Sequence, residues 1–67
     1  MRDRYYALAT KAIRANLITS KEVALIARVG HRKEPYWDRH YRDLKDILIR
    51  RARGKSIPRS LYNELFQ

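Results

Sequence analysis

Arginine and lysine are the residues of this sequence whose chemistry is most evident. Sixteen of the 67 residues are Lys or Arg and seven are Asp or Glu, which gives a formal net charge of +9. Most of the basic residues are arginine, whose planar guanidinium suits bidentate contact with phosphate or carboxylate. We therefore expect a partner that carries negative charge, although net charge favours association without identifying the partner.

The basic residues are concentrated in the second half of the chain. Residues 28–59 contain eleven basic and four acidic side chains, whereas residues 1–27 contain five and two. Residues four apart are neighbours on a helix, so part of this charge can cancel in the pairs Asp38–Arg42, Arg39–Asp43, Arg42–Asp46 and Asp46–Arg50. Uncompensated charge remains in two places. The first basic cluster is Arg28, Arg32 and Lys33, and the second basic cluster is Arg50, Arg51, Arg53, Lys55 and Arg59.

Nucleic acid is the partner that these two clusters favour. Basic side chains that neutralise phosphates release condensed counterions, so they bind nucleic acid with salt-dependent affinity and without reading bases. We expect DNA in preference to RNA, and a regulatory role of the kind that small bacterial and phage proteins have. The alternative is a protein-interaction module whose basic clusters dock on an acidic partner protein, as an accessory or an inhibitor.

Residues 20–44 have the order of a helix-turn-helix unit, with a short capped helix, a turn at Gly30 and a second helix from Pro35. In such a unit the second helix enters the major groove through its N-terminal residues. The predicted base contacts are Tyr36, Arg39 and His40, and the predicted phosphate contacts are Arg32 and Lys33. However, the connection is longer than the usual three to four residues, and Glu34 and Asp38 add negative charge. Two antiparallel helices joined by a glycine turn fit the same pattern.

Catalytic or metal-binding chemistry has few candidate residues. His31, Glu34, Asp38 and His40 form one cluster, but the basic residues that alternate with them oppose a bound cation. Cysteine is absent, which excludes disulfides, zinc–thiolate sites and thiol catalysis. Two glycines are too few for a glycine-rich phosphate loop. We predict a binding protein and not an enzyme, with no cofactor and no metal.

Nothing in the sequence predicts a membrane partner. No apolar run approaches the ~20 residues of a membrane span, and no apolar stretch follows the charged N-terminal residues as a signal peptide requires. A small chain without cysteine fits a reducing compartment better than a secreted one. We therefore expect a cytoplasmic protein.

The first two predicted helices are bounded by local signals. The first begins near residue 3 and ends near Asn16. The second follows Thr19 and Glu22, which have the spacing of a capping box. The expected hydrophobic staple around this box is Ile18 and Val23. This helix should end near residue 28 or 29, because Gly30 is well placed as the left-handed residue that follows a helix.

The last two predicted helices start at prolines. Pro35 suits the first turn of a helix, since its missing N–H has no partner there, and the helix should run to about Arg53 and stop before Gly54. The closing segment has Ser56 and Pro58 as its cap and first turn, followed by apolar residues on one face.

All four segments have a helical period and short connections, so the predicted fold is a single all-α domain of three to four short amphipathic helices. Such a small domain has a thin core. The predicted core residues are Tyr5, Leu8, Ile13, Val23, Ile26, Trp37, Leu44, Ile47, Leu48, Leu61 and Leu65. Tyr36, Ile49 and Phe66 fall at the edge of these stripes, which leaves open partial burial, a homodimer or another partner contact.

Overall fold

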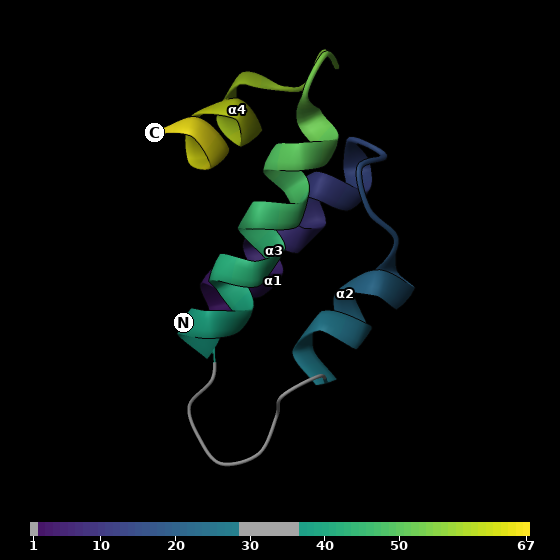
Figure 1. The fold of residues 1–67 in the computed structure, drawn as a ribbon, viewed down its shortest axis with the longest axis vertical. Helices are drawn as coiled ribbons and strands as arrows, with labels where there is room; N and C mark the ends of the chain where they lie inside the picture. Colours follow the sequence, from purple (N-terminus) through teal and green to yellow (C-terminus); the bar gives the residue numbers. More distant parts are fainter. Residues whose placement is uncertain (1, 29–36) are drawn as a thin grey trace.

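The described residues fold into four α-helices, which confirms the predicted all-α class (Figure 1). The computed structural model describes residues 2–28 and 37–67. Its helices are α1 (Arg2–Arg14), α2 (Ser20–Arg28), α3 (Trp37–Ala52) and α4 (Arg59–Phe66). No strand occurs within these two ranges.

The end of α1 is set by Asn16, which adopts the left-handed conformation with a φ of 60°. The Leu17 N–H donates to the Ala12 carbonyl and the Asn16 N–H donates to the Ile13 carbonyl, both over 3.0 Å. This pair of bonds is the Schellman pattern that closes a helix C-terminus. Asn16 is therefore confirmed as the end of the first helix, and the turn after it directs Leu17 into the core.

The start of α2 is the predicted capping box. The Thr19 N–H donates to Glu22 Oε1 over 3.1 Å, and the Glu22 N–H donates to Thr19 Oγ1 over 3.2 Å. Ile18 and Val23, the expected staple residues, are both buried. The helix ends at Arg28, within the predicted limits.

The end of α3 is set by Gly54, which has a φ of 76°. The Lys55 N–H donates to the Ala52 carbonyl over 3.0 Å and tightens the last turn. The stop before Gly54 is therefore confirmed. The predicted start at Pro35 lies outside the described residues.

The start of α4 differs from the prediction. Ser56 does not cap this helix, which begins at Arg59 with Pro58 in the N-cap position and with no side-chain cap. Pro58 has a φ of −58°, close to the value that its ring imposes. The proline therefore fixes the direction of the chain at a helix start that lacks a capping oxygen.

The pair of α1 and α3 forms the centre of the domain. Figure 1 shows these two helices crossing, with α2 and α4 lying on opposite sides of them. The hydroxyl of Tyr5 on α1 donates to the Val23 carbonyl on α2 over 2.6 Å. Because burial raises the pKa of Tyr5 to about 12, the phenol keeps the proton that this bond needs.

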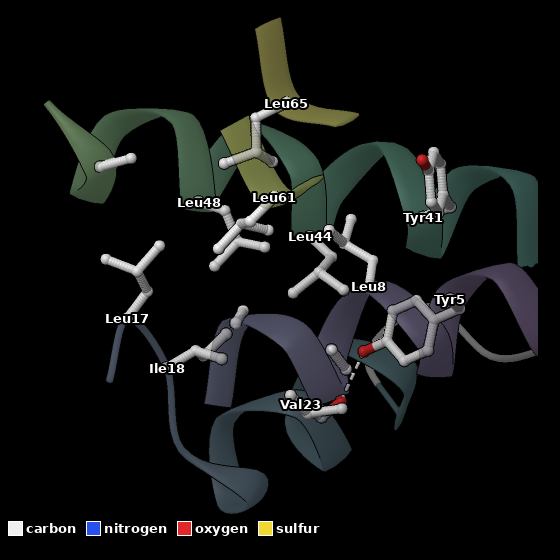
Figure 2. Packing of buried hydrophobic residues seen from close by; sticks show 13 residues of the cluster. Tyr5, Leu8, Leu17, Ile18, Val23, Tyr41, Leu44, Leu48, Leu61 and Leu65 are labelled. Atoms are coloured by element: carbon white, nitrogen blue, oxygen red, sulfur yellow. Dashed lines mark hydrogen bonds between the residues drawn. The ribbon is translucent and has the colours of Figure 1, made fainter. Parts of the chain in front are cut away.

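The core gathers side chains from every helix and from the link between α1 and α2 (Figure 2). Of the predicted core residues, Tyr5, Leu8, Val23, Leu44, Leu48, Leu61 and Leu65 are buried. Buried alanines at positions 9, 12 and 52 let the helices approach one another closely. The complete side chain of a leucine at the centre of such a core contributes about 2–5 kcal/mol to stability.

The remaining predicted core residues are only partly buried. Ile13, Ile26 and Trp37 pack against the core from its margin, and Ile47 is partly exposed beside α2. Of the residues at the edge of the stripes, Ile49 packs against the core and Phe66 is exposed. The domain thus leaves several large apolar side chains in contact with solvent.

Asn16→Ala tests the turn that ends α1. Alanine in the left-handed region costs about 1–2 kcal/mol, so we expect the free energy of unfolding, measured by urea denaturation, to fall by about 1 kcal/mol. Asn16→Gly is the matched control, because glycine adopts this conformation without strain. Equal stability of the alanine and glycine variants would contradict the role given to Asn16.

Candidate nucleic-acid interface

The two predicted basic clusters lie at opposite ends of α3. Arg28 ends α2 at the end of the molecule where α3 begins, whereas the second basic cluster surrounds the end of α3 and the start of α4 (Figure 1). At a rise of about 1.5 Å per residue, α3 separates these ends by roughly 22 Å. The described part of the first cluster therefore does not join the second on one contiguous patch.

All five residues of the second basic cluster are exposed, and four of them take part in neither ion pair of the described residues. These four are Arg50, Arg53, Lys55 and Arg59. No Asp or Glu occurs between Asp46 and Glu64 in the sequence. The link between α3 and α4 therefore presents positive charge with no acidic residue of its own to neutralise it.

Arg51 differs from the rest of its cluster because its guanidinium is held by protein groups. Its Nη1 and Nη2 donate to the two carboxylate oxygens of Glu22 over 2.9 and 2.8 Å, and Nη1 also donates to the Leu17 carbonyl over 3.1 Å. This fork ties the end of α3 to the start of α2. Arg51, predicted as a nucleic-acid contact, therefore has a structural role in the described fold.

The hydrogen bonds from Arg51 lower the pKa of Glu22 from 4.5 to about 2, with further contributions from the Thr19 N–H and the arginine charge. The same hydrogen bonds raise the pKa of Arg51 above its ordinary value. Both groups therefore stay charged over the physiological pH range.

Arg14 is a basic residue that belongs to neither of the two predicted clusters. It is exposed in the last turn of α1. The hydrogen bond from Arg51 to Leu17 shows that the chain just after α1 lies beside the end of α3. The signal was present in the sequence as a basic residue just before the helix end at Asn16, where positive charge also suits the helix dipole.

The exposed face of α3 carries charge of both signs. Asp38, Asp43 and Asp46 are exposed there, together with Arg39 and Arg42. The predicted pairs four residues apart were Asp38–Arg42, Arg39–Asp43, Arg42–Asp46 and Asp46–Arg50. Among the described residues the ion pairs within 4.0 Å are instead Lys11–Glu64 and Arg51–Glu22, which join different helices. The predicted pairing is therefore wrong at contact distance, although the alternation of charge remains.

His40 does not reach the surface. It is only 2% exposed and packs edge-on against Trp37, with ring centroids 5.3 Å apart, and against Tyr5 at 6.2 Å. A base contact by His40 is thus incompatible with the fold. The prediction fails because the apolar stripe of α3 is wide. Position 40 lies three residues after Trp37 and next to Tyr41, so it falls within this stripe.

The other residues of the predicted helix-turn-helix interface have mixed outcomes. Arg28 and Arg39 are exposed. Arg32, Lys33 and Tyr36 lie outside the described residues, as does the connection between α2 and α3. The order of the two helices agrees with the unit, and its turn stays a prediction.

Glu64 fixes α4, and with it Arg59, against the rest of the domain. Lys11 Nζ on α1 donates to Glu64 Oε1 over 3.0 Å, and the Tyr41 hydroxyl on α3 donates to Oε2 over 2.8 Å. Burial alone would raise the pKa of Glu64, but the hydrogen bonds from Tyr41 and Lys11, together with the lysine charge, lower it below its ordinary value. The carboxylate therefore links three helices in its charged form.

An open groove lies between α2 and α3, with a volume of about 390 Å³. Its apolar walls are Leu25, Ile26 and Ile47, and its rim carries Asp43, Asp46 and Arg50. Leu25 is 49% exposed. The groove is a second surface on which a partner could dock.

No three His, Asp or Glu side chains in residues 2–28 and 37–67 gather as a set of metal ligands. In the same ranges, no helix is both long enough and apolar enough to span a membrane.

Comparison with known proteins identified no relative of this chain. No protein-family model, no curated protein and no solved structure matches this chain.

Glu22→Gln tests the link between α2 and α3. A carboxyl whose pKa is lowered on folding stabilises the fold above its unfolded pKa, and this contribution is lost as pH falls through the folded value. We expect the melting temperature of the wild type to fall between pH 4.5 and about 2 more steeply than that of the variant. The dependence that remains in the variant would come from groups such as Glu64.

The matched control is Asp38→Asn, which removes one exposed carboxylate from α3 without touching this link. Its melting temperature should follow the wild-type pH profile. If Glu22→Gln and the wild type lose melting temperature in parallel on acidification, the ion pair with Arg51 does not contribute in solution.

Proposed function

We propose that this chain is a small, non-enzymatic nucleic-acid-binding protein, with a DNA-associated regulatory role, that contacts phosphates through the second basic cluster. The observation that carries the proposal is the acid-free stretch between Asp46 and Glu64, in which Arg50, Arg53, Lys55 and Arg59 are exposed at one end of the molecule. We place the protein in the cytoplasm.

The same observation argues against a purely structural reason for the charge. Arg51 and Lys11 form the ion pairs that hold α2 and α4 in place, and the described fold uses no further exposed basic residue of the second cluster in this way. Basic residues near a helix C-terminus gain only about 0.3–1 kcal/mol from the helix dipole. This effect does not apply to Arg59, which begins α4, so the helix dipole does not account for four exposed basic side chains within ten residues.

Phosphate contact is the chemistry that this arrangement suits best. An arginine can donate two parallel hydrogen bonds to one phosphate, and each neutralised phosphate releases counterions. These contacts position the protein on the nucleic acid but carry no sequence information. Recognition through the exposed face of α3 is less well supported, since Asp38, Asp43 and Asp46 would meet the phosphates of a major groove.

The second candidate is a protein-interaction module that binds an acidic partner. The groove between α2 and α3 favours it, because the apolar surface of Leu25 and Ile47 lies beside Arg50. An amphipathic helix with carboxylates at its edge would fill such a groove. Asp43 and Asp46 on the same rim would repel that edge, so we rank this function second.

Salt dependence of binding tests the proposed function. Four phosphate contacts predict a slope of about −3.6 for log K against log salt on duplex DNA, and about −2.8 on a single strand. Duplex affinity should then fall by about 150-fold between 50 and 200 mM salt. Fluorescence anisotropy with a labelled oligonucleotide of about 20 nucleotides, single-stranded and duplex, measures both slopes.

Arg53→Gln with Arg59→Gln removes two of these contacts and should lower the magnitude of the slope on duplex DNA to about 1.8. The matched control is Arg39→Gln with Arg42→Gln, which removes the same charge from the mixed face of α3 and should leave the slope unchanged. An equal decrease of the slope in the two double variants would show that binding depends on net charge and not on the second basic cluster. If the wild-type protein binds neither single-stranded nor duplex DNA at 50 mM salt, the proposed function is excluded.

Arg32→Gln with Lys33→Gln tests the helix-turn-helix interface in the same assay. Under the proposed function this variant keeps most of the slope, since the second cluster supplies the contacts. If it abolishes binding while the Arg53 and Arg59 variant binds normally, the interface belongs to the first cluster.

A further inference from the structure

The solvent-facing side of α4 carries two aromatic rings. Tyr62 and Phe66 are 52% and 42% exposed, and their centroids lie 4.8 Å apart with the ring planes inclined by 39°. The opposite side of the helix is buried through Leu61 and Leu65. The orientation of α4 is fixed by this burial and by the contacts of Glu64 with Lys11 and Tyr41, so the rings are held outward.

The rings adjoin the second basic cluster. Arg59 precedes Tyr62 by three residues and Phe66 follows it by four, which places all three on one side of the helix. A groove of about 330 Å³ beside them is lined by Ile57, Arg59, Tyr62 and Asn63. The surface formed by Arg59, Tyr62, Asn63 and Phe66, which we term the α4 face, thus combines a cation, two exposed rings and an amide.

Single-stranded nucleic acid is the ligand whose chemistry matches each of these parts. Proteins bind such strands with basic residues along the backbone and aromatic rings on which unpaired bases stack. A duplex offers phosphates but keeps the faces of its bases stacked inside the helix. The exposed rings would therefore contribute to binding of an unpaired segment and add nothing to contact with the outside of a duplex.

A second copy of the chain matches the α4 face less well. Pairing two such faces would bury the rings, but it would also set the positively charged surface around Arg59 in one copy against a surface of the same charge in the other. Like charges at short range are unfavourable, and the acid-free link has no carboxylate to offset them. A polyanion with exposed bases relieves both the charge and the apolar exposure.

We propose that the α4 face binds an unpaired segment of nucleic acid, with a base stacked on Tyr62 and Phe66 and the adjacent phosphate held by Arg59. This inference rests on the proposed function and specifies its ligand as single-stranded. The amide of Asn63 borders the same groove, where it can hydrogen-bond to the edge of a base.

Tyr62→Ala tests the inference in a binding assay with a thymidine oligomer of about 20 nucleotides and with its duplex with the complementary strand. Loss of one stacked base should weaken single-strand binding by at least about fivefold and leave duplex binding unchanged. The slope of single-strand affinity against salt should stay at the wild-type value, because no charge is removed. Tyr62→Trp should restore single-strand affinity, since a larger ring preserves the stacking surface.

Tyr6→Ala is the matched control. Tyr6 is 43% exposed on α1 and borders α2 and the ring of Trp37, on the side of the molecule opposite to α4 (Figure 1), so its removal should not change the preference for single strands. Circular dichroism on each variant confirms that the helices remain, which the exposure of both tyrosines leads us to expect.

Two outcomes of the binding assay would overturn the inference while leaving the proposed function intact. One is binding of both probes with no effect of Tyr62→Ala, and the other is an equal loss on the single strand and the duplex. A Tyr62→Ala variant that reduces self-association in sedimentation analysis but keeps full single-strand affinity would assign the rings to a dimer contact and overturn it as well. Failure of the wild type to bind either probe would instead exclude the proposed function itself.

Discussion

The packing of α1 against α3 is the contact on which the other two helices depend. Tyr5 and Leu8 from one helix and Leu44 and Leu48 from the other are completely buried. Neither α2 nor α4 reaches the other in the described fold, and each packs on this central pair. A domain of this size buries only about 60% of the surface that its unfolded chain exposes. The peripheral helices therefore have little apolar area to hold them and rely on polar contacts with the centre.

Two carboxylates supply polar contacts of this kind, in addition to the bond from the Tyr5 hydroxyl to the Val23 carbonyl. Glu22 closes the N-terminus of α2 and binds Arg51, and Glu64 joins α4 to Lys11 and Tyr41. The consequence for function is a division among the basic residues. Those that face a carboxylate of another helix maintain the fold, whereas the exposed residues after Asp46 have no acidic neighbour in their own segment.

Features that depend on a few adjacent residues could be predicted from the sequence. The capping box at Thr19, the left-handed residues Asn16 and Gly54 and the apolar stripes all belong to this kind, because local chemistry decides them. The roles of Arg51 and His40 could not be read in this way. Each is one helical turn or less from exposed basic residues, and only the position of another helix shows which side chain is bound or buried. The structure therefore shows His40 buried and Arg51 bound to Glu22, while the nucleic-acid interface itself stays a prediction.

The second basic cluster has a consequence for the stability of the free domain. Four like charges held near one helix end repel one another, and this repulsion acts on a fold with a thin core and only two ion pairs in its described part. A polyanion that binds there removes the repulsion and binds the folded state in preference to the unfolded chain, so it stabilises the fold by mass action. The exposed rings on α4 are unfavourable because their apolar surface contacts water. The exposed charges beside them are unfavourable because they repel one another. Under the proposed function, a ligand that carries both bases and phosphates would relieve both of these unfavourable exposures at once.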